Sequence, residues 1–225
     1  MLNPDYYNNP HVQQALTEKG IAVLDNALIP EKADALYDEL MASNVWHREQ
    51  IDRENEDGSR FIYKRNRIQF DSGAEPDTMI ELRDYFRSDT CLDWVTLMSG
   101  LSCFDVEGSA ASMSPGDFLG RHSDDVGGFG RVIAYILFLT KDWRESWGGE
   151  LVFEPTNEVI TPSFNKLVMF RVNKDSFHHV NTISENAVAP RLNIVGWFNK
   201  NTQRATGDSH KIFKPNWKMP KISIP

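Results

Sequence analysis

The chain has 225 residues, a formal net charge of −8, and a composition with 40% hydrophobic and 25% charged residues. These values are typical of a globular protein with one sizeable core, and the chain is short for two full domains. The acidic net charge disfavours nucleic acid as an obligate partner, because phosphate backbones are held by clustered Lys and Arg, but it is compatible with a basic protein or peptide substrate.

The ends of the chain and its cysteines favour a cytoplasmic protein. Residues 1–14 lack a basic segment followed by an apolar one, so we expect no signal peptide. No apolar run approaches the roughly 18 residues that span a bilayer, and we expect no membrane partner. Cys91 and Cys103 are too few for a disulfide scaffold, and we expect both to be small, reduced core residues.

We expect one domain over residues 1–225, with a mainly helical support in 1–103, a catalytic core in 104–200 and a C-terminal tail in 201–225. Within the support, residues 9–20 are typical of a short helix ending at Gly20, and Pro30 is typical of the start of the next helix. The other elements expected here are a strand at 21–29, the helix at 30–43, and one or two helices over 76–101.

Residues 46–76 interrupt the helical part. Their acidic, glycine-containing centre indicates a hairpin tip, and residues 60–70 (RFIYKRNRIQF) alternate apolar and basic side chains like a strand. One interpretation is an exposed hairpin, since charged runs are usually solvated. The other is a lid over a substrate pocket, which would carry Tyr63, Arg65 and Arg67.

From residue 104 the pattern changes to short strands separated by turn signals. The expected strands are 104–113, 117–124, 131–140, 150–155, 166–172, 177–183 and 191–199. Short strands at this spacing predict an antiparallel sandwich or jelly roll. Two facing sheets enclose a cavity on which inward side chains from several strands can converge.

A candidate metal site lies in this second half. His122 and Asp124 in FLGRHSDD stand one residue apart, so on a strand both side chains point to the same face. A third ligand is available from the SFHHV segment, as His178 or His179. Two histidines and one carboxylate form the facial triad of non-haem Fe(II) oxygenases. The alternative is that these histidines are core or rim residues with satisfied hydrogen bonds.

Arg191 opens the otherwise apolar strand RLNIVGWF. A buried arginine needs an anion, and no acidic residue is close in the sequence. A carboxylate ligand could supply that anion through a bidentate pair. The alternative is an edge position with a solvated guanidinium.

Three motifs in order carry a resemblance to a known family: HSD at 122–124, SFH at 176–178 and RLNIVGWF at 191–198. Together with the segment that runs from GDFLGRHSDD to SFHHV, they resemble the iron(II)- and 2-oxoglutarate-dependent dioxygenases. The segment is similar to the prolyl hydroxylase branch, which includes the hypoxia-factor and ribosomal-protein prolyl hydroxylases. The resemblance covers roughly residues 104–200.

The resemblance implies a mainly β fold with α helices, a double-stranded β-helix (jelly roll) core with supporting N-terminal helices. It implies that His122, Asp124 and His178 bind Fe(II), that His179 points to the opposite face, and that Arg191 binds the far carboxylate of 2-oxoglutarate. The implied reaction uses O2 to hydroxylate an unactivated C–H bond, most simply of a prolyl residue in a protein or peptide. It releases succinate and CO2, with ascorbate as a supportive reductant.

Three residues depart from the family pattern. Many relatives carry a tyrosine where this chain has Phe138, and often another where it has Met113; the usual serine two residues after the arginine is Asn193. Each lost hydroxyl removes a hydrogen bond of about 1 kcal/mol. We therefore expect the cosubstrate pocket to be arranged differently.

Further residues are weaker candidates. We list Tyr63, Arg65, Arg67, Arg131 and Trp197 as possible substrate contacts. For Arg121 and Arg131 we favour solvated side chains, and for Trp197 a place in the core. Trp147, Gly148 and Gly149 are typical of a tight turn between strands.

Two alternative functions stay open at this point. The same chemistry could hydroxylate a free amino acid or another small metabolite, given the three departures. A jelly-roll binding or sensor module without turnover is the alternative of another class, although a pure binder need not keep both iron and cosubstrate ligands.

Overall fold

The computed structural model describes residues 1–54, 60–125 and 130–201. The helices are α1 (Pro10–Glu18), α2 (Pro30–Ala42), α3 (Asp77–Phe86) and α4 (Asp89–Ser99). The strands are β1 (Ile21–Asp25), β2 (His47–Glu54), β3 (Arg60–Gln69), β4 (Asp105–Met113), β5 (Leu119–His122), β6 (Arg131–Leu139), β7 (Leu151–Phe153), β8 (Glu158–Ile160), β9 (Phe164–Arg171), β10 (His178–Val180) and β11 (Arg191–Asn199). Short 3₁₀ turns lie at Pro4–Tyr6, Glu145–Trp147 and Glu154–Thr156.

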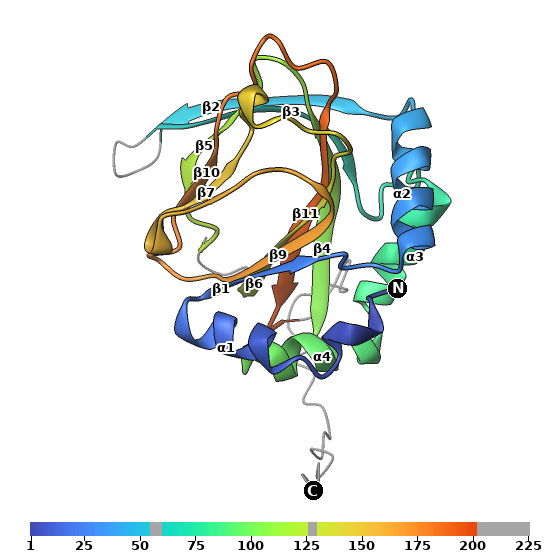
Figure 1. Cartoon of the computed structure of the whole chain (residues 1–225), viewed down its shortest axis with the longest axis vertical. Helices are drawn as coiled ribbons and strands as arrows, with labels where there is room; N and C mark the ends of the chain where they lie inside the picture. The colour runs from blue at the N-terminus through green and yellow to red at the C-terminus, as the bar shows by residue number, and fades with distance from the viewer. Residues whose placement is uncertain (55–59, 126–129, 202–225) are drawn as a thin grey trace, which may run out of the picture.

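All these strands belong to one antiparallel sheet that curls on itself (Figure 1). Its order is β1-β9-β6-β11-β4-β3-β5-β10-β7-β8, and β2 pairs with β3 beside this path. One apolar cluster takes side chains from both arms of the curl, and Phe153 on β7 contacts Phe170 on β9 with ring centroids 5.1 Å apart. The two arms therefore pack face to face, and the predicted jelly-roll core with supporting helices is confirmed.

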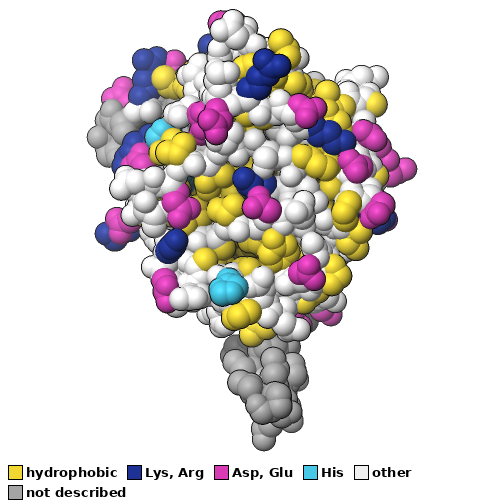
Figure 2. Space-filling view, in the orientation of Figure 1, with side chains coloured by type: hydrophobic (Ala, Val, Ile, Leu, Met, Phe, Trp, Pro, Cys, Tyr) yellow, Lys and Arg dark blue, Asp and Glu magenta, His cyan; other side chains and the backbone are white. Residues whose placement is uncertain are grey.

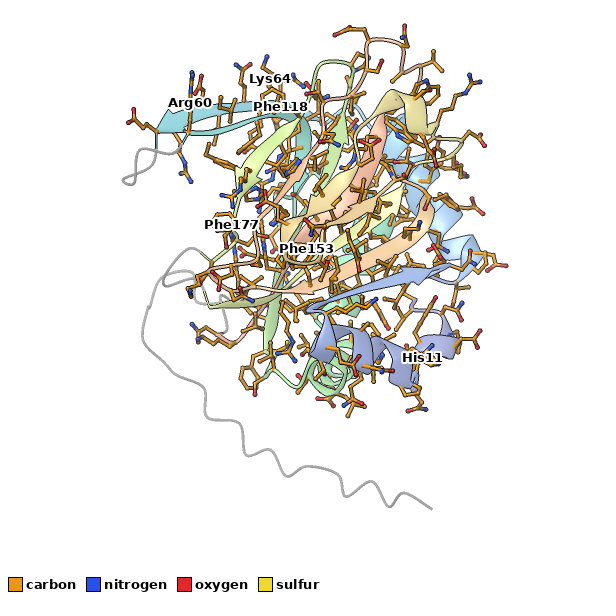
Figure 3. The ribbon with its side chains drawn as sticks, turned by 60° about the vertical axis from the view of Figure 1, so that its left-hand side comes forward. His11, Arg60, Lys64, Phe118, Phe153 and Phe177 are labelled. Carbon is orange, nitrogen blue, oxygen red and sulfur yellow. The ribbon has the colours of Figure 1, made fainter. Side chains whose placement is uncertain are left out.

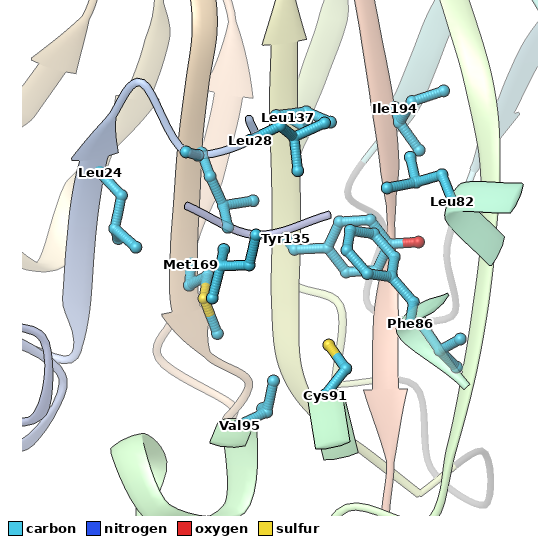
Figure 4. Close-up of a cluster of buried hydrophobic side chains, with 14 of the residues drawn as sticks. Leu24, Leu28, Leu82, Phe86, Cys91, Val95, Tyr135, Leu137, Met169 and Ile194 are labelled. Atoms are coloured by element: carbon cyan, nitrogen blue, oxygen red, sulfur yellow. The ribbon is translucent and has the colours of Figure 1, made fainter. Parts of the chain in front are cut away.

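A second apolar cluster joins the helices to the outer face of the sheet (Figure 4). Phe86 of α3 packs edge to face on Tyr135 of β6, with ring centroids 5.0 Å apart, and both rings are at most 3% exposed. Cys91 and Cys103 are buried in this cluster as free thiols, as the sequence predicts. The helices thus stabilise the sheet from outside and leave the inside of the curl for the site.

The N-terminal part differs from the expected helical support in what it adds to the sheet. Its strand β1 pairs along its whole length with β9, and β3 pairs with β4 and bridges to β5 at Tyr63. Residues 55–59, at the expected hairpin tip, lie outside the described residues. The expected turn between β7 and β9 contains a further strand, β8, which forms an antiparallel pair with β7. β8 has only three residues, too few for an alternation of apolar and polar side chains to predict a strand.

Figure 3 shows Arg60, Lys64 and Phe118 on the β3–β5 side of the curl, and His11 on α1 at the other end of the molecule. Figure 2 shows apolar side chains at the centre of one face of the molecule, with charged side chains spread around them. In the part of the chain that the structure describes, no helix combines the length and apolar character needed to cross a bilayer.

Candidate metal centre and adjoining cationic pocket

His122, Asp124 and His178 converge inside the curl. One potential ligand atom from each residue lies within 4.8 Å of the other two. The Nε2 atoms of His122 and His178 are each 3.5 Å from a different oxygen of the Asp124 carboxylate. The structure therefore brings together the three side chains that the sequence singled out, and within the described residues it groups no other set of three such ligands.

Strand pairing positions the two histidines. His178 is the direct partner of His122 in the antiparallel pair of β10 with β5, and it also pairs with Phe153 on β7. The Nδ1 of His122 lies 2.9 Å from the carbonyl oxygen of Gly120, and the Nδ1 of His178 lies 3.0 Å from that of Ser176. A carbonyl oxygen accepts only from Nδ1–H, so each Nε2 keeps its lone pair for a metal.

Asp124 reaches the site from just beyond β5, and not from within the longer strand that the sequence predicts. The strand ends at His122 because its partner β10 begins at His178. The following chain is held by Ser123, whose hydroxyl donates to the carbonyl of Asn173 at 2.8 Å. The carboxylate still faces both imidazoles.

The electrostatics of the group suit a divalent cation. Burial raises the pKa of the Asp124 carboxyl, but the contact with His122 and the charge of His178 outweigh it, and the pKa falls to about 2. Burial, with repulsion from His122, lowers the pKa of His178 to about 4. At neutral pH Asp124 is therefore an anion and His178 a neutral ligand, which is the donor set that Fe(II) takes in a facial triad.

His179 does not join this group. Its Nδ1 lies 3.6 Å from an Oε1 of Glu154 and makes no hydrogen bond within the described residues. Side chains alternate along β10, so His179 faces away from His122. The structure thus groups His178, the histidine that the resemblance implies, and leaves His179 outside.

Arg191 is buried, with 2% of its surface exposed, and the alternative of a solvated edge residue is wrong. Its Nε donates to the carbonyl of Gly149 at 2.7 Å, and its Nη1 donates to the Oδ1 of Asn193 at 2.8 Å. Within the described residues no carboxylate forms an ion pair with it. Burial lowers the pKa of Arg191 to about 9, which leaves the guanidinium charged at neutral pH. The charge of Glu150 acts in the opposite sense and raises that pKa, but among the described residues this carboxylate forms no ion pair with the buried guanidinium.

The three departures from the family pattern all lie around this guanidinium. The ring centroid of Phe138 is 4.9 Å from the Cζ of Arg191, and the Sδ of Met113 is 3.7 Å from its Nη1. Asn193 is the third, through its Oδ1. Both Met113 and Phe138 belong to the apolar cluster inside the curl, as does Phe170, whose ring lies 4.7 Å from that of His178. One apolar lining therefore connects the metal group with Arg191.

The turn between β6 and β7 closes the pocket over Arg191. Gly148 and Gly149 both have positive φ, as the predicted tight turn requires. A Cβ at Gly149 would lie 3.2 Å from the Cδ of Arg191 and 3.2 Å from the Trp143 ring. Trp143 donates its indole N–H to the carbonyl of Gly148 at 2.9 Å, so it fixes the turn in place.

The β2–β3 hairpin lies beside the metal group, next to His122. Tyr63 is 7% exposed, and Arg65 lies over its ring and donates to Glu49 at 2.9 Å. Arg67 donates to the same carboxylate at 3.2 Å. The nearest hairpin side chain that the structure shows at the ligands is Phe61, whose ring centroid is 5.0 Å from that of His122.

Sequence reasoning did not select Phe61, although it lies on the same face of the strand as Tyr63, Arg65 and Arg67. The alternation of side chains along β3 could have identified it. What was missing was the pairing of β3 with β5, which brings this face of the hairpin beside His122.

Arg131 and Trp197 form a pair on neighbouring strands. The Cζ of Arg131 is 3.5 Å from the centroid of the Trp197 ring, and its Nε donates to Glu107 at 2.7 Å. The expectation that Arg131 is solvated is wrong, because the indole and the carboxylate cover its guanidinium; its side chain is 16% exposed. The Trp197 N–H makes no hydrogen bond within the described residues but helps to lower the pKa of Asp124.

Arg121 lies outside this pocket and is largely solvated, as expected, with 56% of its side chain exposed. It donates to Glu154 at 2.9 Å and stacks on Phe177.

Comparison with known proteins gives a consistent picture. Residues 108–199 match a family model described as the 2OG-Fe(II) oxygenase superfamily. The mouse prolyl 3-hydroxylase OGFOD1 is 35% identical over 115 residues, which cover 47% of this chain and 21% of the mouse protein. The human Egl nine homolog 1 is 26% identical over 214 residues, 87% of this chain and 47% of that protein. The chain thus spans less than half the length of these relatives.

Solved structures support the fold. A Pseudomonas putida prolyl-4-hydroxylase aligns with a TM-score of 0.69 at 20% identity, over 85% of this chain and 98% of that one. A Trichoplax adhaerens prolyl hydroxylase, in complex with a hypoxia inducible factor peptide fragment, aligns with a TM-score of 0.65 at 18% identity, over 84% and 87% of the two chains.

Proposed function

We propose that the chain is a member of the 2OG-Fe(II) oxygenase superfamily, whose family model matches residues 108–199, and that it is an Fe(II)- and 2-oxoglutarate-dependent dioxygenase that hydroxylates a prolyl residue of a protein or peptide. O2 is the oxidant, and succinate and CO2 are the co-products. One observation carries the proposal: a facial His-Asp-His group shares the apolar lining of one curl with a buried arginine that has no ion pair among the described residues.

In this proposal His122, Asp124 and His178 hold Fe(II), and Arg191 holds the far carboxylate of 2-oxoglutarate. Bound Fe(II) and 2-oxoglutarate would supply the oxidising chemistry that activates O2 for C–H hydroxylation. The protein orients both imidazoles through the carbonyls of Gly120 and Ser176. A single anion among the ligands leaves the bound cation with positive charge for a bidentate oxo acid.

The surrounding side chains keep water from the reacting centre. The ring of Phe61 packs at a tilt beside that of His122, and Trp197 is near enough to Asp124 to help lower the pKa of its carboxyl. Exclusion of water strengthens every charge interaction in the site and limits unproductive oxidation. An apolar, aromatic wall also suits the pyrrolidine ring of proline, which offers no hydrogen-bond donor of its own within a chain.

The peptide nature of the substrate is supported by the relatives, since the mouse OGFOD1 is named as a prolyl 3-hydroxylase and the Trichoplax enzyme is bound to a peptide.

The test is a coupled assay on the purified chain with Fe(II), ascorbate, O2 and 2-oxoglutarate. We expect one succinate for each oxygen atom added to a proline-containing peptide, measured by mass spectrometry, and no oxygen added to free proline or other free amino acids. Conversion of a free amino acid alone would replace the proposal with small-molecule hydroxylation.

A matched pair of variants controls the assay. Asp124→Ala is expected to stop succinate formation, whereas Asp125→Ala, a change at the neighbouring exposed carboxylate, is expected to leave it intact. A wild-type chain that binds the metal but never consumes 2-oxoglutarate with any peptide or amino acid would support a binding module instead.

A further inference from the structure

The strand that carries His122 is joined to its neighbours by few backbone pairs. β5 has four residues, and its register with β10 consists of two pairs, His122 with His178 and Leu119 with Val180. Between these pairs the chain advances three residues on β5 and two on β10, an irregularity of the β-bulge kind that interrupts the ladder beside the metal group. On the other side, β5 pairs with β3 at one position, Tyr63. The register that places the two histidines opposite each other therefore needs support from side chains.

Arg121 makes such a contact on the outer face of the same strands. Its Nε donates to both carboxylate oxygens of Glu154 at 2.9 Å each, and its Cζ lies 3.7 Å from the ring centroid of Phe177. Glu154 directly follows β7, and Phe177 directly precedes β10 (Figure 3). One guanidinium therefore joins β5 to the ends of β7 and β10. We call Arg121, Glu154 and Phe177 the outer clamp.

The outer clamp is directly connected to the two histidines through the chain. Arg121 precedes His122, and Phe177 precedes His178. The backbone N–H of Glu154 donates to the carbonyl of Phe177 at 3.0 Å, so the two partners of the guanidinium are also tied to each other. A movement of Arg121 relative to these partners would move His122 relative to His178.

An ordinary surface ion pair is the alternative reading of this contact. Arg121 has 56% of its side chain exposed and Glu154 has 31%, and exposed ion pairs usually contribute little to stability. The outer clamp differs from such a pair because the guanidinium reaches both oxygens of Glu154 and stacks on an aromatic ring, which together restrict its orientation. The effect that we infer is on the geometry of the metal group and not on the overall free energy of unfolding.

We propose that Arg121 is a positioning residue of the metal centre: by binding Glu154 and Phe177 on the outer face, it sets the spacing of His122 and His178 on the inner face. This inference rests on the proposed function, because it takes the two histidines as metal ligands. It gives a role in the site to a side chain that itself lies outside the pocket.

Charge and geometry predict opposite results when Arg121 is removed. The guanidinium is positive and repels a divalent cation, so by Coulomb interaction alone its removal would strengthen metal binding. If Arg121 positions His122, its removal weakens metal binding. The direction of the change in affinity therefore separates the two effects.

The test measures dissociation constants for Mn(II) by titration calorimetry, without cosubstrate or O2, so the readout does not depend on turnover. Arg121→Met removes the guanidinium, and we expect about 10-fold weaker binding, at the lower end of the range for residues that orient metal ligands. Arg121→Lys keeps the charge and one contact with Glu154 but lacks the planar fork, and we expect a loss of about 3-fold. In a Glu154→Gln background, Arg121→Met is expected to cause a smaller loss than in wild type, because its partner is already changed.

Arg60→Met is the matched control. Arg60 is likewise exposed, and its guanidinium donates to both carboxylate oxygens of Asp52 at 2.6 Å, which ties β2 to β3 and not β5 to β10. We expect its affinity for Mn(II) to stay within about 2-fold of wild type.

Hydrogen exchange of the metal-free protein gives a second readout. The backbone N–H groups of residues 119–122 are expected to exchange about 5-fold faster in Arg121→Met than in wild type, whereas those of α1 keep the wild-type rate. Wild-type or tighter binding of Mn(II) by Arg121→Met, or unchanged exchange in β5, would overturn the positioning role and leave the proposed function standing. Failure of the wild-type chain to bind Mn(II) would overturn the metal centre of the proposed function and this inference together.

Discussion

His122 and His178 face each other across the antiparallel pair of β5 with β10, and their ring centroids are 4.2 Å apart. Two imidazoles held this close by backbone pairing, with a carboxylate between their Nε2 atoms, form a preorganised chelate. Little side-chain ordering is then needed when a metal binds, because strand register has already fixed both rings.

The first prediction concerns the anionic ligand. Asp124→Asn keeps the shape of the side chain but removes its charge, and we expect the affinity for Mn(II) to fall by more than about 100-fold. This loss is larger than that expected from removing a residue that only hydrogen-bonds to a metal ligand. Titration calorimetry measures the affinity for Mn(II). Asp125→Asn is the matched control and is expected to bind Mn(II) like wild type, since Asp125 is exposed and lies outside the metal group. Equal affinities in all three proteins would remove Asp124 from the metal site.

The second prediction follows from the lowered pKa of His178, about 4 in the folded protein against 6.5 for an ordinary histidine. Between these values the unfolded chain binds more protons than the folded one, so stability falls as the pH falls through this window. Between pH 7 and pH 5 the metal-free protein is expected to lose about 2 kcal/mol from this residue.

Urea unfolding of metal-free protein at both pH values measures the loss, and comparison with His178→Gln isolates it. Between pH 7 and pH 5 the variant is expected to lose about 2 kcal/mol less stability than wild type. His11→Gln, a change at an exposed histidine on α1, is the matched control for the loss of one imidazole. If His178→Gln lost as much stability as wild type between the two pH values, the pKa of His178 would not be lowered in the fold.

The third prediction concerns Arg191, a buried cation with no ion pair among the described residues. Arg191→Met replaces a buried charge with an apolar side chain of similar length, and we expect the ligand-free protein to be equally stable or up to about 2 kcal/mol more stable. The same variant is expected to lose detectable binding of 2-oxoglutarate to the Mn(II) form. Such a gain of stability with loss of binding is typical of a residue kept for function. Marked destabilisation would instead assign Arg191 a structural role.

The fourth prediction concerns the hairpin. Phe61→Ala removes the ring beside His122, and we expect KM for a peptide substrate to rise about 5- to 10-fold, as for the loss of one aromatic contact. Affinity for Mn(II) should stay within about 2-fold of wild type, because the ring supplies no ligand atom. Phe104→Ala, at a ring that is 42% exposed, is the matched control for a lost phenylalanine. A wild-type KM in Phe61→Ala would exclude the hairpin from substrate binding.

Strand pattern was enough to predict a sandwich or jelly roll and to place His122 and Asp124 on one face, because local alternation is visible in the sequence. The choice of His178 over His179 needed the family resemblance, in which the distal ligand follows Ser-Phe. The partners of Arg191 were harder to predict, because Gly149 comes from a distant turn and only the folded register brings its carbonyl within 2.7 Å. The stacking of Arg131 on Trp197 was missed for the same reason: alternation gives the face of a strand, but not the side chain on its neighbour.

The short strand β8 shows another limit. Its three residues, Glu158–Ile160, lie between turn-forming residues and owe their extended form to pairing with β7 rather than to their own pattern. Phe61 was missed for a similar reason, since its place beside His122 depends on a strand contributed by the N-terminal part of the chain.

The central claim is that one cation and one diacid share the interior of the curl. A crystal structure of the chain with Mn(II) and 2-oxoglutarate, grown without O2, tests it most directly. We predict a single ion bonded to the Nε2 atoms of His122 and His178 and to the carboxylate of Asp124, with the far carboxylate of the diacid against Arg191. An ion bound to other residues, or a diacid that leaves Arg191 without an anion, would contradict the account.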